Sequence, residues 1–151
     1  NPFKSKKSLA TDYDRLHLLQ TAIGDHLKIR ASNIEFDLPS PSYTIDTLTY
    51  LKEKYPKHEF ALIMGGDNLA SFHKWKNHEM ILEHHDIYVY NRPGQEEHQF
   101  QGQSRIHFAE APLLSLSASY IRQAIKAGHS IQYLVPDTVY LELLNSHLYR
   151  N

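Results

Sequence analysis

The segment LSASYIRQAI, Leu116–Ile125, places two serine hydroxyls and a guanidinium close to a predicted helix start. Ser117 and Ser119 stand at the beginning of an amphipathic run, and Arg122 falls on its first turn. A helix start has unpaired N–H groups and a partial positive charge, so these side chains could help to bind an anion. Serine is equally a favoured N-cap residue, and capping is the more general use of such a pattern. The segment alone leaves both interpretations open.

A second candidate is GGD, Gly65–Asp67, which closes the apolar run FALIM. Ligands of open α/β sheets bind beyond the carboxyl ends of the strands, and this tripeptide follows a predicted strand. Glycine lets a ligand approach the backbone, and an aspartate just beyond it can accept hydrogen bonds from ribose hydroxyls. A plain turn explains Gly and Asp equally well.

Thr44 and Trp75 also allow either a structural role or a role in ligand binding. PSYT places Thr44 at another predicted helix start, where capping is again the simpler role. Trp75, the only tryptophan, belongs to the core or offers a stacking surface for a flat ring. Arg92 in NRPG fits a turn but could reach a phosphate, and Lys4 in NPFK fits a solvated surface.

Composition excludes several other kinds of chemistry. The chain has no cysteine, which removes disulfides, zinc-thiolate sites and cysteine nucleophiles and is compatible with a reducing cytoplasm. Its eleven histidines show no metal-binding spacing, and no nucleophile elbow is present. A net charge of −1 gives no broad positive field, so we expect neither nucleic acid nor a membrane as a partner. No long apolar span or signal peptide is visible, so we predict a cytoplasmic location.

The predicted elements alternate between helix and strand. Helices are expected over residues 11–27, 44–55 and 136–149, each with a capping or proline signal at its start. Strands are expected at 34–38, where apolar and polar residues alternate, at 60–67, where a continuous apolar run indicates burial on both faces, and within 86–94 and 106–112. The order predicts an α/β fold with a mainly parallel sheet, in a single domain over residues 1–151.

Taken in chain order, the motifs NPFK, PSYTIDTL, IMGGDNL, KW, RPG, LSASYIR and YLVPDTV resemble those of the bacterial nicotinate-nucleotide adenylyltransferases. The resemblance covers nearly the whole chain. It implies a Rossmann-like nucleotidyltransferase fold and transfer of the adenylyl group of ATP to nicotinate mononucleotide, which yields deamido-NAD and pyrophosphate. It also implies Mg²⁺ held mainly by the ATP phosphates.

The resemblance also assigns roles to individual residues. LSASYIR matches the family's I-S-S-T-x-I-R signature, so Ser117, Ser119 and Arg122 are expected to bind the ATP phosphates, with Arg122 as the catalytic charge. Ala118 stands where the family has a second serine, which removes one hydroxyl. Carried over in the same way, the remaining assignments are Gly65 and Asp67 for the adenosine half of ATP, and Thr44, Trp75, Lys4 and Arg92 for the nicotinate nucleotide.

One family motif has no counterpart in this sequence, which begins at Asn1. The family starts with a strand and the loop G-x-F-x-P-x-H-x-G-H, whose histidines stabilise charge on the reacting phosphates. We therefore expect the chain to lack a first strand-loop-helix unit, and the 151 residues alone to have little activity.

Two rival functions stay open at this point. One is another adenylyltransferase of the superfamily, such as the phosphopantetheine enzyme, although PSYTIDTL with Trp75 favours a pyridine ring. The other is a nucleotide-binding module without turnover. The sequence leaves the oligomeric state open, a homo-oligomer included.

Overall fold

The computed structural model describes residues 9–90, 100, 102–112 and 115–150. The chain divides into two compact units, one formed by residues 1–2 and 34–114 and the other by residues 3–33 and 115–151. We call them the sheet unit and the helical unit. The single domain expected over residues 1–151 stays a prediction.

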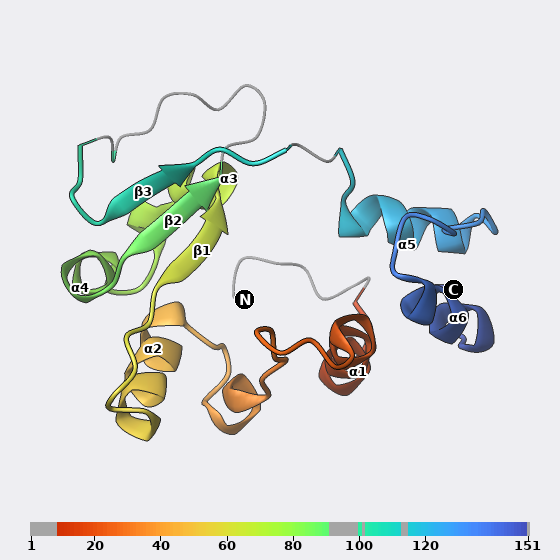
Figure 1. Ribbon diagram of the computed structural model, residues 1–151, viewed down its shortest axis with the longest axis horizontal. Helices are drawn as coiled ribbons and strands as arrows, with labels where there is room; N and C mark the ends of the chain where they lie inside the picture. The colour runs from red at the N-terminus through yellow and green to blue at the C-terminus, as the bar shows by residue number, and fades with distance from the viewer. Residues whose placement is uncertain (1–8, 91–99, 101, 113–114, 151) are drawn as a thin grey trace. The chain divides into compact units, whose positions relative to one another are not determined.

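The sheet unit contains three parallel strands, β1 (Leu62–Gly65), β2 (Ile87–Tyr90) and β3 (Ile106–Ala109), in the order β1-β2-β3 (Figure 1). The register aligns Leu62 with Ile87 and Ile87 with Ile106, so all three strands begin at one edge of the sheet and end at the other. The predicted parallel sheet is confirmed for the part of the chain that the structure describes.

Short helical segments connect β1 to β2 and cover one face of the sheet. They are α3 (Gly66–Ala70), the 3₁₀ turn η3 (Phe72–Lys74) and α4 (His78–His84), while α2 (Thr44–Lys54) precedes β1 and contacts α4. Leu69, Phe72 and Ile81 from these segments are fully buried against Ile87 and Val89 of β2. Burial of such side chains typically contributes about 1.5–3 kcal/mol each, so this cluster dominates the stability of the sheet unit.

The other face of the sheet corrects one sequence-based expectation. The run FALIM predicted a strand buried on both faces, but the side chain of Ile63 is 79% exposed and its register partner Tyr88 is 45% exposed. The connections between β1 and β2 lie on the face of Met64 and Val89, and side chains alternate between faces. Ile63 and Tyr88 therefore point to the side that those connections leave uncovered.

A second correction concerns NIEFDL, which was predicted to form a strand. Residues Ile34–Asp37 instead form a 3₁₀ turn, η2, in which the Leu38 N–H donates to the Glu35 carbonyl. Only Ile34 is buried there, while Phe36 is 37% exposed. The alternating apolar residues therefore do not share a buried face, which a strand of this pattern would need. Two nearby prolines, Pro39 and Pro41, also lack the N–H group that a hydrogen bond to a neighbouring strand requires.

The helical unit consists of α1 (Asp12–Ile23), α5 (Ala118–Lys126) and α6 (Asp137–Asn145). The predicted cap of α1 is confirmed, because the Thr11 hydroxyl accepts a hydrogen bond from the Asp14 N–H at 3.1 Å. Helices α1 and α6 contact one another, and the Thr138 hydroxyl donates to the Thr21 carbonyl. The buried residues of this unit are Ala124, Ile131, Val139 and Leu143.

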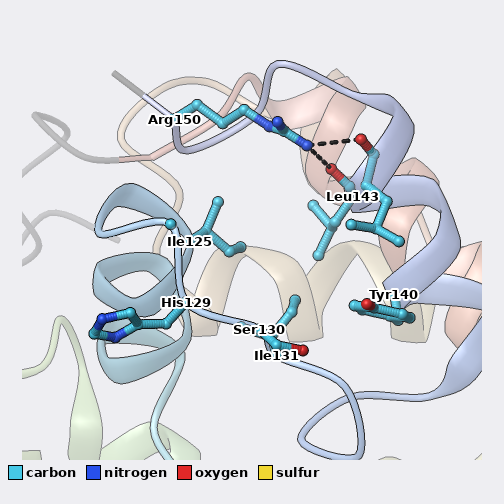
Figure 2. Close-up of a pocket in the computed structure, with 9 residues that line it drawn as sticks. Ile125, His129, Ser130, Ile131, Tyr140, Leu143 and Arg150 are labelled. Carbon is cyan, nitrogen blue, oxygen red and sulfur yellow. Dashed lines mark hydrogen bonds between the residues drawn. The ribbon is translucent and has the colours of Figure 1, made fainter.

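A cavity of about 280 Å³ lies beside this small core (Figure 2). Ile125 and Ile131 line it together with Tyr140 and Leu143, and Arg150 closes one side. The Arg150 guanidinium donates to the carbonyls of Leu143 and Leu144, which belong to the last turn of α6. The lining contains none of the residues that the sequence assigned to substrate binding.

None of the helices in the described ranges is long and apolar enough to cross a membrane.

Candidate functional site

Gly65 and Asp67, which were predicted to contact a nucleotide, lie at the carboxyl end of β1. Gly65 ends the strand and is buried, while Asp67, in the first turn of α3, is exposed. A Cβ atom added to Gly65 would lie 2.5 Å from Asp67 Oδ1, closer than real Cβ atoms come to other heavy atoms. Glycine at position 65 therefore makes room for the Asp67 carboxylate over the strand end.

Tyr90 belongs to the same edge and was missed in the sequence analysis. It ends β2, its register partner is Gly65, and its ring and hydroxyl lie 3.5 Å from the position of a Gly65 Cβ. Tyr90 lies within residues 86–94, where a strand was predicted, and neighbouring parallel strands end at one edge of a sheet, so its position was a detectable signal.

Thr44 is the first residue of α2, as the proline-rich approach to it predicted. Tyr43 occupies the N-cap position in an extended conformation and forms no side-chain capping hydrogen bond. Its carbonyl accepts from the Thr47 N–H at 3.1 Å, so the helix is regular from its first turn. The start of α2 thus lacks the side-chain capping hydrogen bond that was expected if PSYT served only as a helix cap.

Trp75 follows η3 directly and is half-buried. Its ring meets Phe72 edge-on, with centroids 5.3 Å apart and planes at 61°, and it packs against the main core cluster. The core position expected of Trp75 is therefore confirmed in part, because the indole packs against the core but is not fully buried. Stacking of a flat ring on its exposed part stays a prediction.

An ion pair connects the segment after Trp75 to the first turn of α2. Lys76 Nζ donates to both carboxylate oxygens of Asp46, at 2.9 and 2.8 Å, and lies 4.9 Å from the centroid of the Tyr43 ring. The partners are 30 residues apart in sequence. A single sequence holds no signal that pairs one lysine with one of many carboxylates, and these residues were missed for that reason.

The start of α5 confirms the capping role of Ser117, while binding of an anion there stays a prediction. Ser117 is the N-cap, and its hydroxyl accepts from the Tyr120 N–H at 3.1 Å. Arg122 lies on the first turns and donates to the Ser119 hydroxyl at 3.1 Å. The two serines and the arginine are therefore together on one helix end, where Ser119 orients the guanidinium.

The predicted residues fall into two groups. Gly65, Asp67, Thr44 and Trp75 belong to the sheet unit, whereas Ser117, Ser119 and Arg122 belong to the helical unit. Lys4 and Arg92 lie outside the described residues. The structure thus gives the local geometry of each group, and the joint site is an expectation from the motif series.

A polar cluster at the amino ends of the strands lies away from this edge. Asp86 directly precedes β2, and its carboxylate is 2.8 Å from His107 Nε2 and 3.6 Å from the Arg105 guanidinium. The hydrogen bond from His107, aided by the charges of Arg105 and His107, holds the pKa of Asp86 below its usual value. Since ligands of open parallel sheets bind at the carboxyl ends, we assign this cluster a structural role.

Known proteins resemble this chain over most of its length. The cytidylyltransferase-like family model matches residues 1–124. A Cytophaga hutchinsonii protein, named "Probable nicotinate-nucleotide adenylyltransferase", is 48% identical over 151 residues, which are 100% of this chain and 79% of the relative. A Flavobacterium johnsoniae protein of the same name is 48% identical over 152 residues, 99% of this chain and 79% of the relative.

A solved structure gives the fold independently. The Plasmodium falciparum nicotinic acid mononucleotide adenylyltransferase complexed with NaAD superposes with a TM-score of 0.70 at 20% identity, over 97% of this chain and 78% of that one. The fold is therefore the Rossmann-like nucleotidyltransferase fold that the motifs implied. The chain belongs to the cytidylyltransferase-like family, in its group of nicotinate-nucleotide adenylyltransferases.

Proposed function

We propose that this protein transfers the adenylyl group of ATP to nicotinate mononucleotide, producing deamido-NAD and pyrophosphate. The observation that carries the proposal is the 48% identity to a relative named for this activity, which extends over 100% of the chain. In the reaction a phosphate oxygen of the mononucleotide attacks the α-phosphorus of ATP. The bond from that phosphorus to the bridging oxygen breaks, and pyrophosphate leaves.

No side chain has to act as a nucleophile in this displacement. The protein contributes alignment of the two phosphates and stabilisation of the charge that develops on them. Arg122 suits that role because its guanidinium is always charged and is oriented by Ser119. We assign Ser117, Ser119 and Arg122 to the ATP phosphates, and Lys4 and Arg92 to the phosphate of the nicotinate nucleotide.

The carboxyl end of β1 suits the adenosine half of ATP. Gly65 carries no side chain that would block a ligand, and the Asp67 carboxylate beside it is exposed and able to accept from ribose hydroxyls. Both residues are anchored by fully buried neighbours, notably Leu69. This part of the site is therefore held by the core of the sheet unit.

The pyridine ring is assigned to Thr44 and Trp75. The accessible part of the Trp75 indole offers a stacking face, and the start of α2 offers N–H donors together with the Thr44 hydroxyl. A ring carboxylate can accept from several donors, whereas an amide would turn its NH₂ toward them. We therefore expect the acid nucleotide to be preferred by about 1–3 kcal/mol, the usual penalty for unpaired buried donors.

Mg²⁺ is part of the proposal as a companion of ATP. Among the described residues no cluster of three or more His, Cys, Asp or Glu could cage a metal ion. These residues fit an ion that the ATP phosphates hold, because Mg²⁺ commonly keeps several waters and binds through substrate phosphates rather than in a protein cage. When bound, the ion neutralises phosphate charge.

The test is pyrophosphate release by protein expressed from its complete reading frame, with ATP and each of three acceptors. Release with nicotinate mononucleotide, above that with nicotinamide mononucleotide, is expected. Preference for phosphopantetheine would identify the rival adenylyltransferase. ATP binding without release from any acceptor would identify a binding module.

A pair of variants tests the ring assignment. Thr44→Ala should narrow the gap between acid and amide nucleotides, and Trp75→Ala should impair both substrates because both share the pyridine face. Thr49→Ala is the matched control, since Thr49 lies on the same helix and its hydroxyl donates to the Ile45 carbonyl within that helix. An intact acid preference in Thr44→Ala would contradict the assignment.

A further inference from the structure

The Asp46–Lys76 ion pair joins the two chain segments that carry the residues assigned to the pyridine ring. Asp46 stands two positions after Thr44 on the first turn of α2, and Lys76 directly follows Trp75. Both oxygens of Asp46 accept from Lys76 Nζ, at 2.9 and 2.8 Å. Each charge is therefore attached to the backbone segment of one ring-binding residue.

The pair has more than one fixed contact. Lys76 Nζ also lies 4.9 Å from the centroid of the Tyr43 ring, a distance at which a cation is attracted to the face of the ring. Tyr43 is the N-cap of α2 and precedes Thr44. Lys76 is thus held over the start of α2 by a carboxylate and by an aromatic face.

The charges of this pair matter because the two candidate substrates differ in charge at the ring. Nicotinate carries a carboxylate where nicotinamide carries a neutral amide, so nearby charge acts on one and not on the other. Asp46 alone would repel the carboxylate at the start of α2. Lys76 cancels that repulsion, because the two opposite charges are in direct contact.

We propose that the Asp46–Lys76 pair is a specificity determinant for the pyridine nucleotide, in which Lys76 neutralises Asp46 and so allows a ring carboxylate to bind. The inference rests on the proposed function and deepens it. Neither residue needs to touch the substrate, so both are positioning residues that act through the local charge.

A purely mechanical role predicts a different pattern. If the pair only tied the Trp75 segment to α2, removing either partner would loosen the ring site for acid and amide alike. Under the charge role the two single variants act in opposite directions. Lys76→Gln leaves Asp46 uncompensated and disfavours the acid, whereas Asp46→Asn leaves Lys76 uncompensated and favours it.

The experiment is the ratio of kcat/KM for nicotinate and nicotinamide mononucleotides in wild type, Lys76→Gln, Asp46→Asn and the double variant. We expect the acid-to-amide ratio to fall about three- to tenfold in Lys76→Gln and to rise by a similar factor in Asp46→Asn, as for a nearby unit charge under surface screening. The double variant, again neutral, should return toward the wild-type ratio.

The variants should remain folded, because the side chains of Lys76 and Asp46 are 43% and 42% exposed and such ion pairs contribute little to stability. Thermal unfolding of each variant verifies this. Lys54→Gln is the matched control. It removes a lysine from the last turn of α2, the helix that carries Asp46 on its first turn, and should leave the acid-to-amide ratio unchanged. Raising the salt concentration should shrink both single-variant shifts.

Two results would overturn the inference while leaving the proposed function intact. One is a wild type that turns over the nicotinate nucleotide, with ratios in both single variants equal to the wild-type ratio. The other is a shift of the acid-to-amide ratio in the same direction in both single variants, because removal of opposite charges must shift it in opposite directions. A wild type that releases no pyrophosphate with either nucleotide would instead contradict the proposed function itself.

Discussion

The sheet unit and the helical unit hold the predicted site residues by different means. The largest fully buried side chains of the described chain, Phe72, Leu69, Ile81, Ile87 and Val89, all belong to the sheet unit. The buried residues of the helical unit keep 4–7% of their surface exposed and lie beside a cavity of about 280 Å³ (Figure 2). Packing therefore fixes the carboxyl end of β1 more firmly than it fixes the start of α5.

The predicted phosphate-binding residues, Ser117, Ser119 and Arg122, are held by local hydrogen bonds rather than by core packing. The Ser117 hydroxyl accepts a hydrogen bond from the Tyr120 N–H, and the Arg122 guanidinium donates to the Ser119 hydroxyl, each across three positions of α5 and its cap. Such contacts form wherever the helix forms, whatever packs behind it. We conclude that core substitutions should act on the sheet unit mainly through stability, and that substitution of Arg122, which does not cap the helix, should act mainly on binding.

The largest expected effect is on the free energy of unfolding, and it compares one substitution in both units. Leu69→Ala should cost about 4–5 kcal/mol, because Leu69 is fully buried, and Leu143→Ala about 2–3 kcal/mol, because Leu143 already borders a cavity. Urea denaturation of the two variants, with unchanged m-values, measures the difference. Equal losses would mean that the two cores are equally well packed.

Arg122→Ala should separate binding from stability in the helical unit. Loss of a charged hydrogen-bond donor to phosphate weakens ATP binding by about 1.5–3 kcal/mol, while the free energy of unfolding should change by about 0.5 kcal/mol or less. Titration calorimetry with ATP and thermal unfolding measure the two quantities. Gln123→Ala, the exposed neighbour on the same helix, serves as the control and should bind ATP normally. Unaltered ATP affinity in Arg122→Ala would reduce the motif to a helix cap.

Gly65→Ala tests whether close packing at the carboxyl end of β1 positions the Asp67 carboxylate. The added Cβ would lie 2.5 Å from Asp67 Oδ1, so the carboxylate must shift, and kcat/KM for ATP should fall about tenfold, or roughly 1.4 kcal/mol. Because the effect acts through Asp67, the same change in an Asp67→Ala background should add little. Fully additive losses would show that Gly65 acts independently of that carboxylate.

The smallest expected effect is a pH dependence in the sheet unit. The hydrogen bond from His107 lowers the pKa of Asp86 in the folded state, so the ionised carboxylate stabilises the fold above the usual value near 3.8. This contribution is lost as the pH falls through the lowered pKa. Melting temperatures measured below about pH 4 should therefore decline less steeply in Asp86→Asn than in wild type. Parallel curves for the two proteins would remove Asp86 from the acid response.

The sequence predicted well those features that depend on neighbouring residues. The cap from Thr11 to Asp14, the helix that begins at Thr44 and the cap at Ser117 each use contacts within a few positions, and all three are present. The prediction failed for Ile34–Asp37, where a short alternating pattern fits a strand but the burial that would select a strand is missing. A five-residue pattern cannot specify what packs against it.

The amino-acid sequence by itself determined the family, the parallel strands and the residue types of the predicted phosphate-binding motif. Each of these depends on residues that are close together in the sequence or on the order of motifs along it. Only the tertiary structure decided that Ile63 is exposed, that Tyr90 lies beside Gly65 and that Lys76 pairs with Asp46. Those features depend on which distant segments meet when the strands align and the connecting helices pack on one face. Propensity and spacing act over a few residues, whereas a contact across 30 residues is fixed by the fold as a whole.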